Sequence, residues 1–498
     1  MGQLQYAYDG FERASRTYKI SNSVSLATTY TFKAGTGAGT TTLIPQSMNT
    51  AGPNWNDQYS YTYDSMGNIA TVSHGGNTTR YTYDSLNQLT REDNQAAGKS
   101  WVYSYDTGGN ITSAKEYAYT TGNLGSVQST RTYTYGDSNW RDKLTSYAGS
   151  SITYDAIGNP LSYRGMTFTW DMGRQLKTVT SGGTTTTYKY NSSGIRTSKT
   201  TGSVTTEYFL EDSRVVRSSD GTNVVMYFYD ENGSPVSFRA KSGGSYSSYF
   251  YVKDLQGDIV AITDKYGAKV VEYTYDAWGK VLTTTGSLAS TIGASNPYRY
   301  RGYWYDTETG LYYLQSRYYD PTTGRFINAD ILVSTEQGIL GCNMFAYCEN
   351  NPANYKDPNG SKMVICPIHF GQVIIQSYDE EQNDDKSIVL SSEHHKRGTT
   401  NPANKNKHQN GQSRKIRDAG NEKGDLRRQS RSNKRRTNIE VVPQFESTVG
   451  GISAVVASGI GILYIIGNDI SIIGVLDDYA LMPLITVFNN GIQVLIGK

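Results

Sequence analysis

The residues best suited to acid–base or metal chemistry gather in the C-terminal part of the chain. Four of the five histidines lie after residue 360, and His394, His395 and His408 are accompanied by Glu393 and Asp418. Imidazole and carboxylate groups together can provide a general base and metal ligands, as hydrolytic enzymes require. Their spacing matches no nuclease signature, so ordinary polar histidines remain the alternative, and no metal or cofactor is expected.

A strongly basic stretch accompanies these residues. Residues 401–436 contain twelve lysines and arginines and three acids, a net charge of +9. Clustered cations neutralise phosphates, which is compatible with RNA or DNA binding. The stretch has no aromatic residues, and this argues against stacking on single-stranded bases. A solvated helix with a linker, or a patch that contacts an anionic membrane surface, are the alternatives.

The end of the chain is apolar. Residues 447–468 and 479–497 are uncharged stretches of 22 and 19 residues, and Pro483 interrupts the second. A helix of about 20 apolar residues spans a bilayer, and small residues at every fourth position of the first stretch suit close helix packing. The sequence therefore predicts a helical hairpin over 447–497 that inserts into a membrane. A Gly-rich apolar hairpin packed within a soluble domain is the alternative.

The composition of the whole chain favours β structure. It contains 42 tyrosines and 51 glycines, whereas only 37% of the residues are hydrophobic and 18% are charged. Tyrosine suits a half-buried pleated surface and glycine suits turns. Three cysteines argue against a disulfide framework. The opening residues lack the basic and apolar regions of a signal peptide, so we expect a longer parent polypeptide or an export route not visible in this chain.

One unit recurs through the first part of the chain. Two aromatic residues separated by one position are followed by an acidic or amide residue, a short gap, a glycine and an Ile or Leu. Copies include YTYDSMGNI at Tyr61, YTYDSLNQL at Tyr81 and YSYDTGGNI at Tyr103. Further copies lie at or around Tyr6, Tyr154, Phe168, Tyr188, Tyr227 and Tyr273.

The repeated unit has a direct structural interpretation. Side chains alternate along a strand with a period of two, so the two aromatic rings lie on one face. The aspartate opens a turn by binding backbone amides, and Gly or Asn supplies the left-handed position. Each unit is therefore predicted to be a strand–turn–strand element of about 20 residues, which must stack on its neighbours to bury its aromatic face.

These units resemble the YD repeats of RHS proteins and related toxin-complex subunits, in which the repeats wind as a β-sheet spiral into a hollow shell. A denser motif follows, reading NPYRYRGYWYDTETGLYYLQSRYYDPTTGRFINAD up to Asp330 and closing with NNPANYKDPNG at Gly360. This segment, residues 296–360, is similar to the RHS-associated core domain. A Tyr- and Thr-rich adhesin or fibre is the alternative that the repeats alone leave open.

The resemblance implies an aspartyl-type self-protease in the core that frees a C-terminal payload inside the shell. Asp330 and Asp357 match the two carboxylates, and Arg325 is implied as an electrostatic or structural partner. Two neighbouring carboxylates can share a proton and act as base and acid, because like charges this close cannot both ionise. The interval between the aspartates is longer than in the family pattern, and Ser361 stands where cleaving members carry Leu. Ordinary turn formation by both aspartates is the alternative.

The expected architecture is mainly β, with a YD-repeat shell at 1–295, an RHS core at 296–360 and a small, mostly helical, partly apolar payload at 361–498. The expected function is delivery of a toxic payload in secreted or contact-dependent competition, with the target-cell membrane as the target. A nuclease payload that acts on nucleic acid and a non-toxic cell-surface adhesin are the alternatives. A cognate immunity protein, and an upstream part of the same polypeptide or a secretion machinery, are the expected partners.

Overall fold

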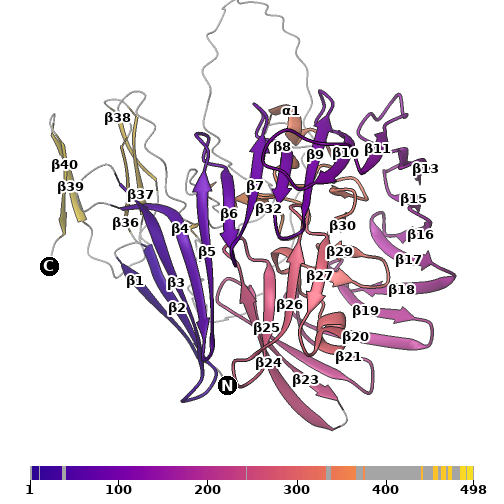
Figure 1. The fold of residues 1–498 in the computed structure, drawn as a ribbon, viewed down its shortest axis with the longest axis horizontal. Coiled ribbons are helices and arrows are strands. Elements are labelled where there is room, and N and C mark those ends of the chain that lie inside the picture. Colours follow the sequence, from indigo (N-terminus) through magenta and orange to yellow (C-terminus); the bar gives the residue numbers. More distant parts are fainter. Residues whose placement is uncertain are drawn as a thin grey trace, which may run out of the picture. The chain divides into compact units, whose positions relative to one another are not determined.

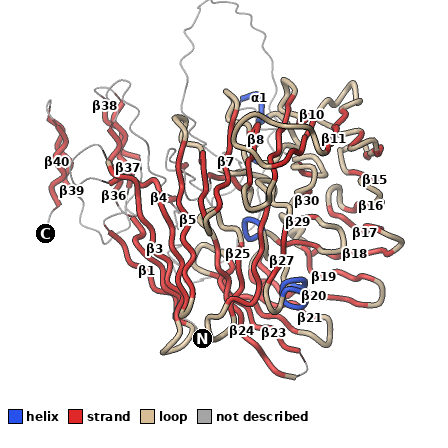
Figure 2. The backbone as a smooth tube through the Cα atoms, in the orientation of Figure 1, coloured by secondary structure: helices blue, strands red, loops and turns tan. Residues whose placement is uncertain are grey.

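The computed structural model describes residues 3–9, 12–35, 41–242, 244–331 and 338–365, together with seven short strands further along the chain. The chain divides into two compact units, Met1–Phe370 and Gly371–Lys498. Strands and the turns between them make up nearly all of the described chain (Figure 2). The expectation of a mainly β protein is therefore confirmed.

The first unit is built around two large antiparallel sheets in which each strand pairs with its neighbours in the sequence (Figure 1). Antiparallel neighbours need only short hairpin connections, as the repeated units predict. The first sheet comprises β1 (Gln3–Asp9), β2 (Glu12–Lys19), β3 (Ser25–Ala34), β4 (Thr41–Gly52), β5 (Trp55–Tyr63), β6 (Ile69–His74), β7 (Asn77–Tyr83), β8 (Leu89–Asn94), β9 (Lys99–Tyr105), β10 (Ile111–Ala118), β11 (Ser129–Thr134), β12 (Ser146–Tyr147) and β13 (Ser150–Ser151).

The second sheet continues the same pattern along the chain. It comprises β14 (Thr153–Tyr154), β15 (Pro160–Tyr163), β16 (Met166–Asp171), β17 (Gln175–Ser181), β18 (Thr184–Tyr190), β19 (Arg196–Thr201), β20 (Val204–Glu211), β21 (Arg214–Ser219), β22 (Val224–Tyr229), β23 (Pro235–Ser242), β24 (Ser245–Lys253), β25 (Ile259–Thr263), β26 (Lys269–Tyr275) and β27 (Val281–Thr285).

The segment after β27 forms smaller elements within the same unit. A four-stranded sheet contains β28 (Trp304–Asp306), β29 (Leu311–Tyr313), β30 (Tyr318–Asp320) and β31 (Arg325–Phe326), and β32 (Tyr355–Lys356) pairs with β33 (Val364–Ile365). The helical turns are η1 (Ala289–Gly293), η2 (Tyr300–Gly302), α1 (Gly338–Gly341) and η3 (Cys348–Asn350). We call residues 296–360 the core segment.

In several repeats the turn is organised by the aspartate, as predicted. At Asp106, one carboxylate oxygen accepts the backbone N–H groups of Gly108 and Asn110, both at 2.9 Å, and the other accepts the side-chain amide of Asn110 at 3.0 Å. The same pattern recurs at Asp64, Asp84 and Asp155. The residue between the two that donate their backbone N–H groups has a left-handed conformation, with a φ of 75° at Gly109 and 62° at Asn87. Asparagine tolerates this conformation better than other residues with a side chain, which explains the Asn in one copy.

The second aromatic residue of each repeat links neighbouring repeats. The Tyr83 hydroxyl donates to the Ile69 carbonyl at 2.8 Å, so it reaches the residue that begins the return strand of the preceding copy. Equivalent bonds join Tyr190 to Leu176, Tyr229 to Val215 and Tyr275 to Ile259. A buried hydroxyl needs a partner, and the carbonyl of the adjacent hairpin supplies one. Stacked repeats are therefore held by polar contacts as well as by their rings.

The core segment lies against the repeat turns. Its side chains Leu311, Tyr312 and Tyr319 are fully buried and share one hydrophobic cluster with Leu89 and Leu176 of the repeats. Side-chain amides then tie it to three successive turns, through Asn351 to Asn68 at 3.1 Å, Asn350 to Gln88 at 2.9 Å and Asn343 to Asn110 at 2.8 Å. The last residue of each of these three turns is thus bound directly by the core segment.

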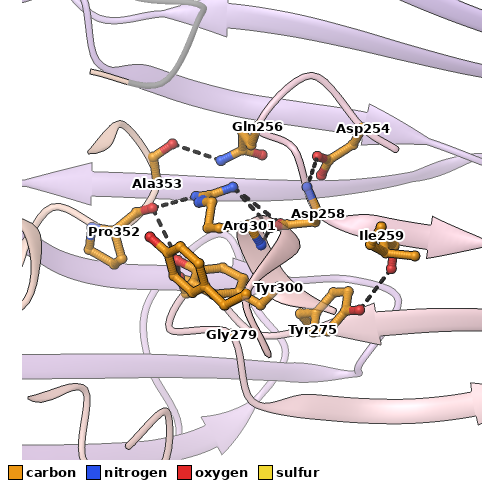
Figure 3. Close-up of polar contacts among 12 residues, drawn as sticks. Asp254, Gln256, Asp258, Ile259, Tyr275, Gly279, Tyr300, Arg301, Pro352 and Ala353 are labelled. Atoms are coloured by element: carbon orange, nitrogen blue, oxygen red, sulfur yellow. Dashed lines mark hydrogen bonds and ion pairs between the residues drawn. The ribbon is translucent and has the colours of Figure 1, made fainter. Parts of the chain in front are cut away.

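Arg301 makes a second set of links at the other end of the repeats (Figure 3). Its guanidinium donates to both carboxylate oxygens of Asp258 at 3.2 Å and to the carbonyl of Pro352. The side-chain amide of Gln256 donates to the Ala353 carbonyl at 2.7 Å. The segment around Pro352 and Ala353 is therefore fixed to the turn between β24 and β25.

The described residues of the second unit are strands. β34 (Ile374–Ile375) pairs with β35 (Ile439–Glu440), and β36 (Ser453–Ala457), β37 (Gly461–Ile466) and β38 (Asp469–Ile473) form one sheet. β39 (Pro483–Phe488) pairs with β40 (Gly491–Ile496). The described parts of 447–497 therefore differ from the expected helical hairpin, because the many β-branched residues there also suit a strand. None of the helices in the described residues has the length and apolar character needed to cross a membrane.

Replacing Asp106 by Ala tests the importance of the repeat turns. The carboxylate accepts three hydrogen bonds and orients Asn110, which in turn contacts the core segment, so we expect Asp106→Ala to lower the free energy of unfolding by about 2 kcal/mol in urea titrations. Asp171→Ala is the matched control, because the Asp171 side chain is 53% exposed in a turn of different hydrogen bonding. Equal losses for both variants would contradict this role of the turn.

Candidate functional site

The two predicted aspartates meet at one arginine that the sequence analysis did not single out. Arg317 lies between β29 and β30, Asp330 follows β31, and Asp357 follows β32. One terminal nitrogen of the Arg317 guanidinium lies 3.0 Å from an oxygen of Asp330 and 3.0 Å from an oxygen of Asp357. Residues 27 positions apart in the chain are therefore brought side by side, as the family resemblance implies.

The three charged groups are nearly enclosed by protein. Their side chains are 6% exposed for Arg317, 13% for Asp330 and 3% for Asp357. Burial raises the pKa of Asp357 above its usual value, although the adjacent Arg317 charge opposes the shift. Burial likewise lowers the pKa of Arg317, against the pull of both carboxylates. A carboxyl group with a raised pKa beside a second carboxylate is the arrangement in which a proton can be shared.

Backbone contacts fix the aspartates relative to the loop that follows. One oxygen of Asp357 accepts the backbone N–H groups of Gly360 at 2.9 Å, Ser361 at 3.1 Å and Lys362 at 3.2 Å. The Asp357 backbone N–H in turn donates to the Tyr303 hydroxyl at 2.7 Å. Asp357 therefore organises the turn that runs from Asp357 to Lys362.

Arg317 also contacts the carbonyl group inside this loop. Its Nε donates to the Gly360 carbonyl, and its other terminal nitrogen donates to the Met344 carbonyl at 3.2 Å. The Met344 carbonyl also accepts the backbone N–H of Asp330 at 2.9 Å. One guanidinium thus joins two carboxylates and the carbonyl of the residue that ends the DPNG motif. A cation on a carbonyl oxygen stabilises negative charge that develops there during acyl transfer.

Gly360 is the residue that this close approach requires. Its φ is 77°, and a Cβ at this position would lie 2.7 Å from the Leu314 carbonyl oxygen and 3.0 Å from the Arg317 backbone nitrogen. The Asn359 carbonyl accepts the Ser316 hydroxyl at 2.8 Å, so the facing segment is held at this separation. Any larger residue would push the loop away from Arg317.

Arg325, which the family motif implies as an electrostatic or structural partner, makes contacts of the structural kind. Its guanidinium donates to the Asp142 carbonyl at 2.9 Å and to the Asn343 side chain at 3.3 Å, and it lies over the Tyr135 ring. Among the described residues, no ion pair joins it to Asp330 or Asp357. Arg325 attaches the core segment to the repeats, and the charge partner of the aspartates is Arg317. Arg317 is part of the core motif, in the segment SRYYDP, and could have been considered from the sequence. Only the folded structure shows which arginine contacts both carboxylates.

The other predicted functional residues lie elsewhere. His394, His395, His408, Glu393, Asp418 and the basic stretch 401–436 are outside the described residues. Within the part of the chain that the structure describes, no group of three or more His, Cys, Asp or Glu residues is arranged to hold a metal ion. Cys348 is buried beside the core segment's tyrosines and Cys342 is exposed, while Cys366 is outside the described residues.

Comparison with known proteins extends over the repeats and most of the core segment. The Teneurin YD-shell family model matches residues 58–353, more than half of the chain. The tRNA3(Ser)-specific nuclease WapA of Bacillus spizizenii is 36% identical over 288 residues, which cover 56% of this chain and 12% of that protein. The double-stranded DNA deaminase toxin A of Burkholderia cenocepacia is 26% identical over 336 residues, which cover 60% of this chain and 22% of that protein. The chain therefore spans less than a quarter of the length of either relative.

The fold is also found among solved structures. The crystal structure of TcdB2-TccC3-TEV aligns with a TM-score of 0.55 and 19% identity, covering 72% of this chain and 19% of that chain. At this identity the alignment shows a common fold. The match of the family model shows that the chain belongs to the Teneurin YD-shell family, which confirms its resemblance to the YD-repeat proteins of the RHS type.

Proposed function

We propose that this chain is the delivery part of a polymorphic toxin together with its payload. The repeats at 1–295 form the shell, the core segment at 296–360 completes it, and residues 361–498 are the payload. The observation that carries this proposal is the position of the paired aspartates. Asp357 accepts the backbone N–H of Gly360, the residue at which the core motif ends. The relatives support it, since both the tRNA nuclease and the DNA deaminase toxin are named for attack on nucleic acids.

The payload is proposed to act on nucleic acid. The net charge of +9 over residues 401–436 supports this target, because clustered Lys and Arg neutralise phosphates. The printed substrates of the two relatives, a tRNA and double-stranded DNA, point in the same direction. The membrane is the second candidate target, favoured by the uncharged stretches 447–468 and 479–497. The proposed setting is secretion or presentation at a cell surface, with a cognate immunity protein that protects the producing cell.

We further propose that the core segment cleaves its own chain between Gly360 and Ser361. Asp330 acts as the base that takes a proton from a water molecule, and the hydroxide adds to the Gly360 carbonyl carbon. Arg317, whose Nε already binds the Gly360 carbonyl, stabilises the negative charge on that oxygen. Asp357 lies 3.1 Å from the Ser361 nitrogen and supplies the proton that this leaving amine requires. The products are a carboxylate at Gly360 and a free amine at Ser361.

Expression inside bacteria tests the payload proposal. We expect residues 361–498 to arrest growth and to degrade or modify RNA or DNA while the membrane potential stays intact. A variant with the basic residues Arg427, Arg428, Arg435 and Arg436 changed to Gln should relieve the arrest, because phosphate contacts would be lost. Growth and nucleic-acid integrity are the measurements, and expression of residues 1–360 is the control. Normal growth would favour a non-toxic adhesin, and loss of membrane potential with intact nucleic acid would favour the membrane as target.

Self-cleavage predicts a specific response of the full chain to substitution. The purified protein should yield a fragment whose N-terminus is Ser361, and Asp330→Asn and Asp357→Asn should each slow its appearance by at least about 100-fold. Arg317→Lys should slow it as well, because a lysine cannot contact both carboxylates and the carbonyl together. Arg325→Lys is the matched control and should leave the cleavage rate within a few-fold. Gel electrophoresis and N-terminal sequencing are the measurements, and an intact wild-type chain would contradict the proposal.

The pH dependence of cleavage follows from the raised pKa of Asp357. Asp357 must be protonated to give a proton to the leaving amine of Ser361, so we expect the rate to fall as the pH rises through the folded pKa of Asp357. The free energy of unfolding changes with pH in the same direction. Because the pKa of Asp357 is raised in the folded state, its protonation stabilises the folded protein at low pH, and this contribution is lost as the pH rises through the folded pKa. A cleavage rate that increases steadily with pH would contradict the assignment of Asp357 as the acid.

The substitution Gly360→Ala tests the close contact between Gly360 and the segment around Arg317, apart from the left-handed backbone of Gly360. A Cβ at Gly360 would collide with the Leu314 carbonyl and the Arg317 backbone, so the variant should lose cleavage and unfold at lower urea than wild type. Gly149→Ala is the matched control, because Gly149 has a φ of 83° but a methyl group placed there would meet nothing within 4 Å. Both variants carry the left-handed cost of about 1–2 kcal/mol, and only the first carries the collision. Equal effects on cleavage would exclude a role for the contact with Arg317.

A further inference from the structure

The first unit contains a cavity that neither delivery nor cleavage uses. Its volume is about 140 Å³, and it lies between the second sheet and the core segment. Engineered protein cavities of about 150 Å³ accept a benzene molecule, so this space can hold a single six-membered ring. The lining includes Tyr208, Val215 and Tyr229 from the sheet and Trp304 and Tyr313 from the core segment. Aromatic walls of this kind suit a flat ring, which can pack face to face or edge to face.

The charge of the cavity is positive. Arg196 and Arg214 are among the residues that line it, all of which the structure describes, and none of them is acidic. Arg196 is already neutralised by Asp306, to which it makes two hydrogen bonds of 2.6 and 3.0 Å. Within the described ranges Arg214 forms an ion pair with Asp212 at 3.7 Å, and the side chains are 41% and 82% exposed. An ion pair this exposed contributes little free energy, so Arg214 is still able to bind an anion.

The residues that line the cavity are held in place by hydrogen bonds and ring contacts within the protein. The Tyr229 hydroxyl lies 2.6 Å from the Tyr298 hydroxyl, and the Tyr313 hydroxyl accepts the backbone N–H of Arg196 at 3.1 Å. The guanidinium of Arg196 also lies 4.3 Å from the centre of the Tyr313 ring. A ligand would therefore enter a preformed space and would not have to order its own binding site, which favours affinity.

We propose that this cavity binds a small molecule made of one six-membered ring with an anionic group, of the aromatic carboxylate class. The ring occupies the space among Tyr208, Tyr229, Trp304 and Tyr313, and the anion pairs with Arg214. The proposal extends beyond toxin delivery, because it gives the shell a ligand of its own. It depends on neither self-cleavage nor the activity of the payload.

Binding of benzoate to the full chain tests the proposal by calorimetry or by ligand-observed NMR. Benzoate should bind saturably, while benzyl alcohol, which has the ring without the charge, and acetate, which has the charge without the ring, should each bind at least about tenfold more weakly. Arg214→Gln should weaken benzoate binding by about tenfold and leave benzyl alcohol unchanged. Val215→Phe fills the cavity and should abolish binding of both ring compounds.

The matched control is Arg217→Gln on the same strand. Arg217 packs over the exposed Phe209 ring at 4.6 Å and does not line the cavity, so benzoate affinity should be unchanged. Urea unfolding of each variant establishes that it is folded, and Arg214→Gln alone suffices if Val215→Phe does not fold. Absence of saturable benzoate binding to wild type, or equal weakening by Arg214→Gln and Arg217→Gln, would overturn the proposal.

Discussion

A hairpin that carries two aromatic rings on one face cannot bury them by itself, and this constraint governs the structure. Each repeat stacks on the next, and the rings of the first aromatic position, such as Tyr103 and Tyr188, end up in the core. Full burial of one large apolar side chain contributes about 1.5–3 kcal/mol, so a succession of repeats gains stability only while the face stays covered. The core segment provides that cover, because its Leu311, Tyr312 and Tyr319 enter the same cluster.

The repeats could be predicted from the sequence because their structure is local. An aspartate followed five residues later by a return strand specifies the turn, and the left-handed residue between them could be predicted even where Asn87 replaces glycine. The motif of the core segment could be recognised in the sequence, but its contacts could not be predicted from it. Asn343 and Asn350 find their partners among residues more than 200 positions away, and no spacing rule in the sequence encodes that distance.

The candidate site divides along the same line. Asp330 and Asp357 were predicted from the motif, and the structure brings them together. Arg325 was named as their electrostatic or structural partner and Arg317 was not singled out. Both arginines lie in or beside a strand of the same small sheet, and only the fold decides which one contacts the aspartates. The apolar end of the chain was expected to be helical on the basis of its lack of charge. Lack of charge does not distinguish helix from strand, and Ser453–Ala457 and Gly461–Ile466 are strands.

The amide contacts between the core segment and the first repeats have a consequence for how this protein tolerates its surroundings. Asn343, Asn350 and Asn351 bind their partners through neutral groups that do not titrate. These amide contacts themselves carry no charge, so dissolved salt does not screen them as it screens exposed ion pairs. The Arg317 cluster, by contrast, consists of three ionisable groups. A change of acidity therefore acts directly on the groups around Gly360, whereas the amide contacts of Asn343, Asn350 and Asn351 carry no charge to lose.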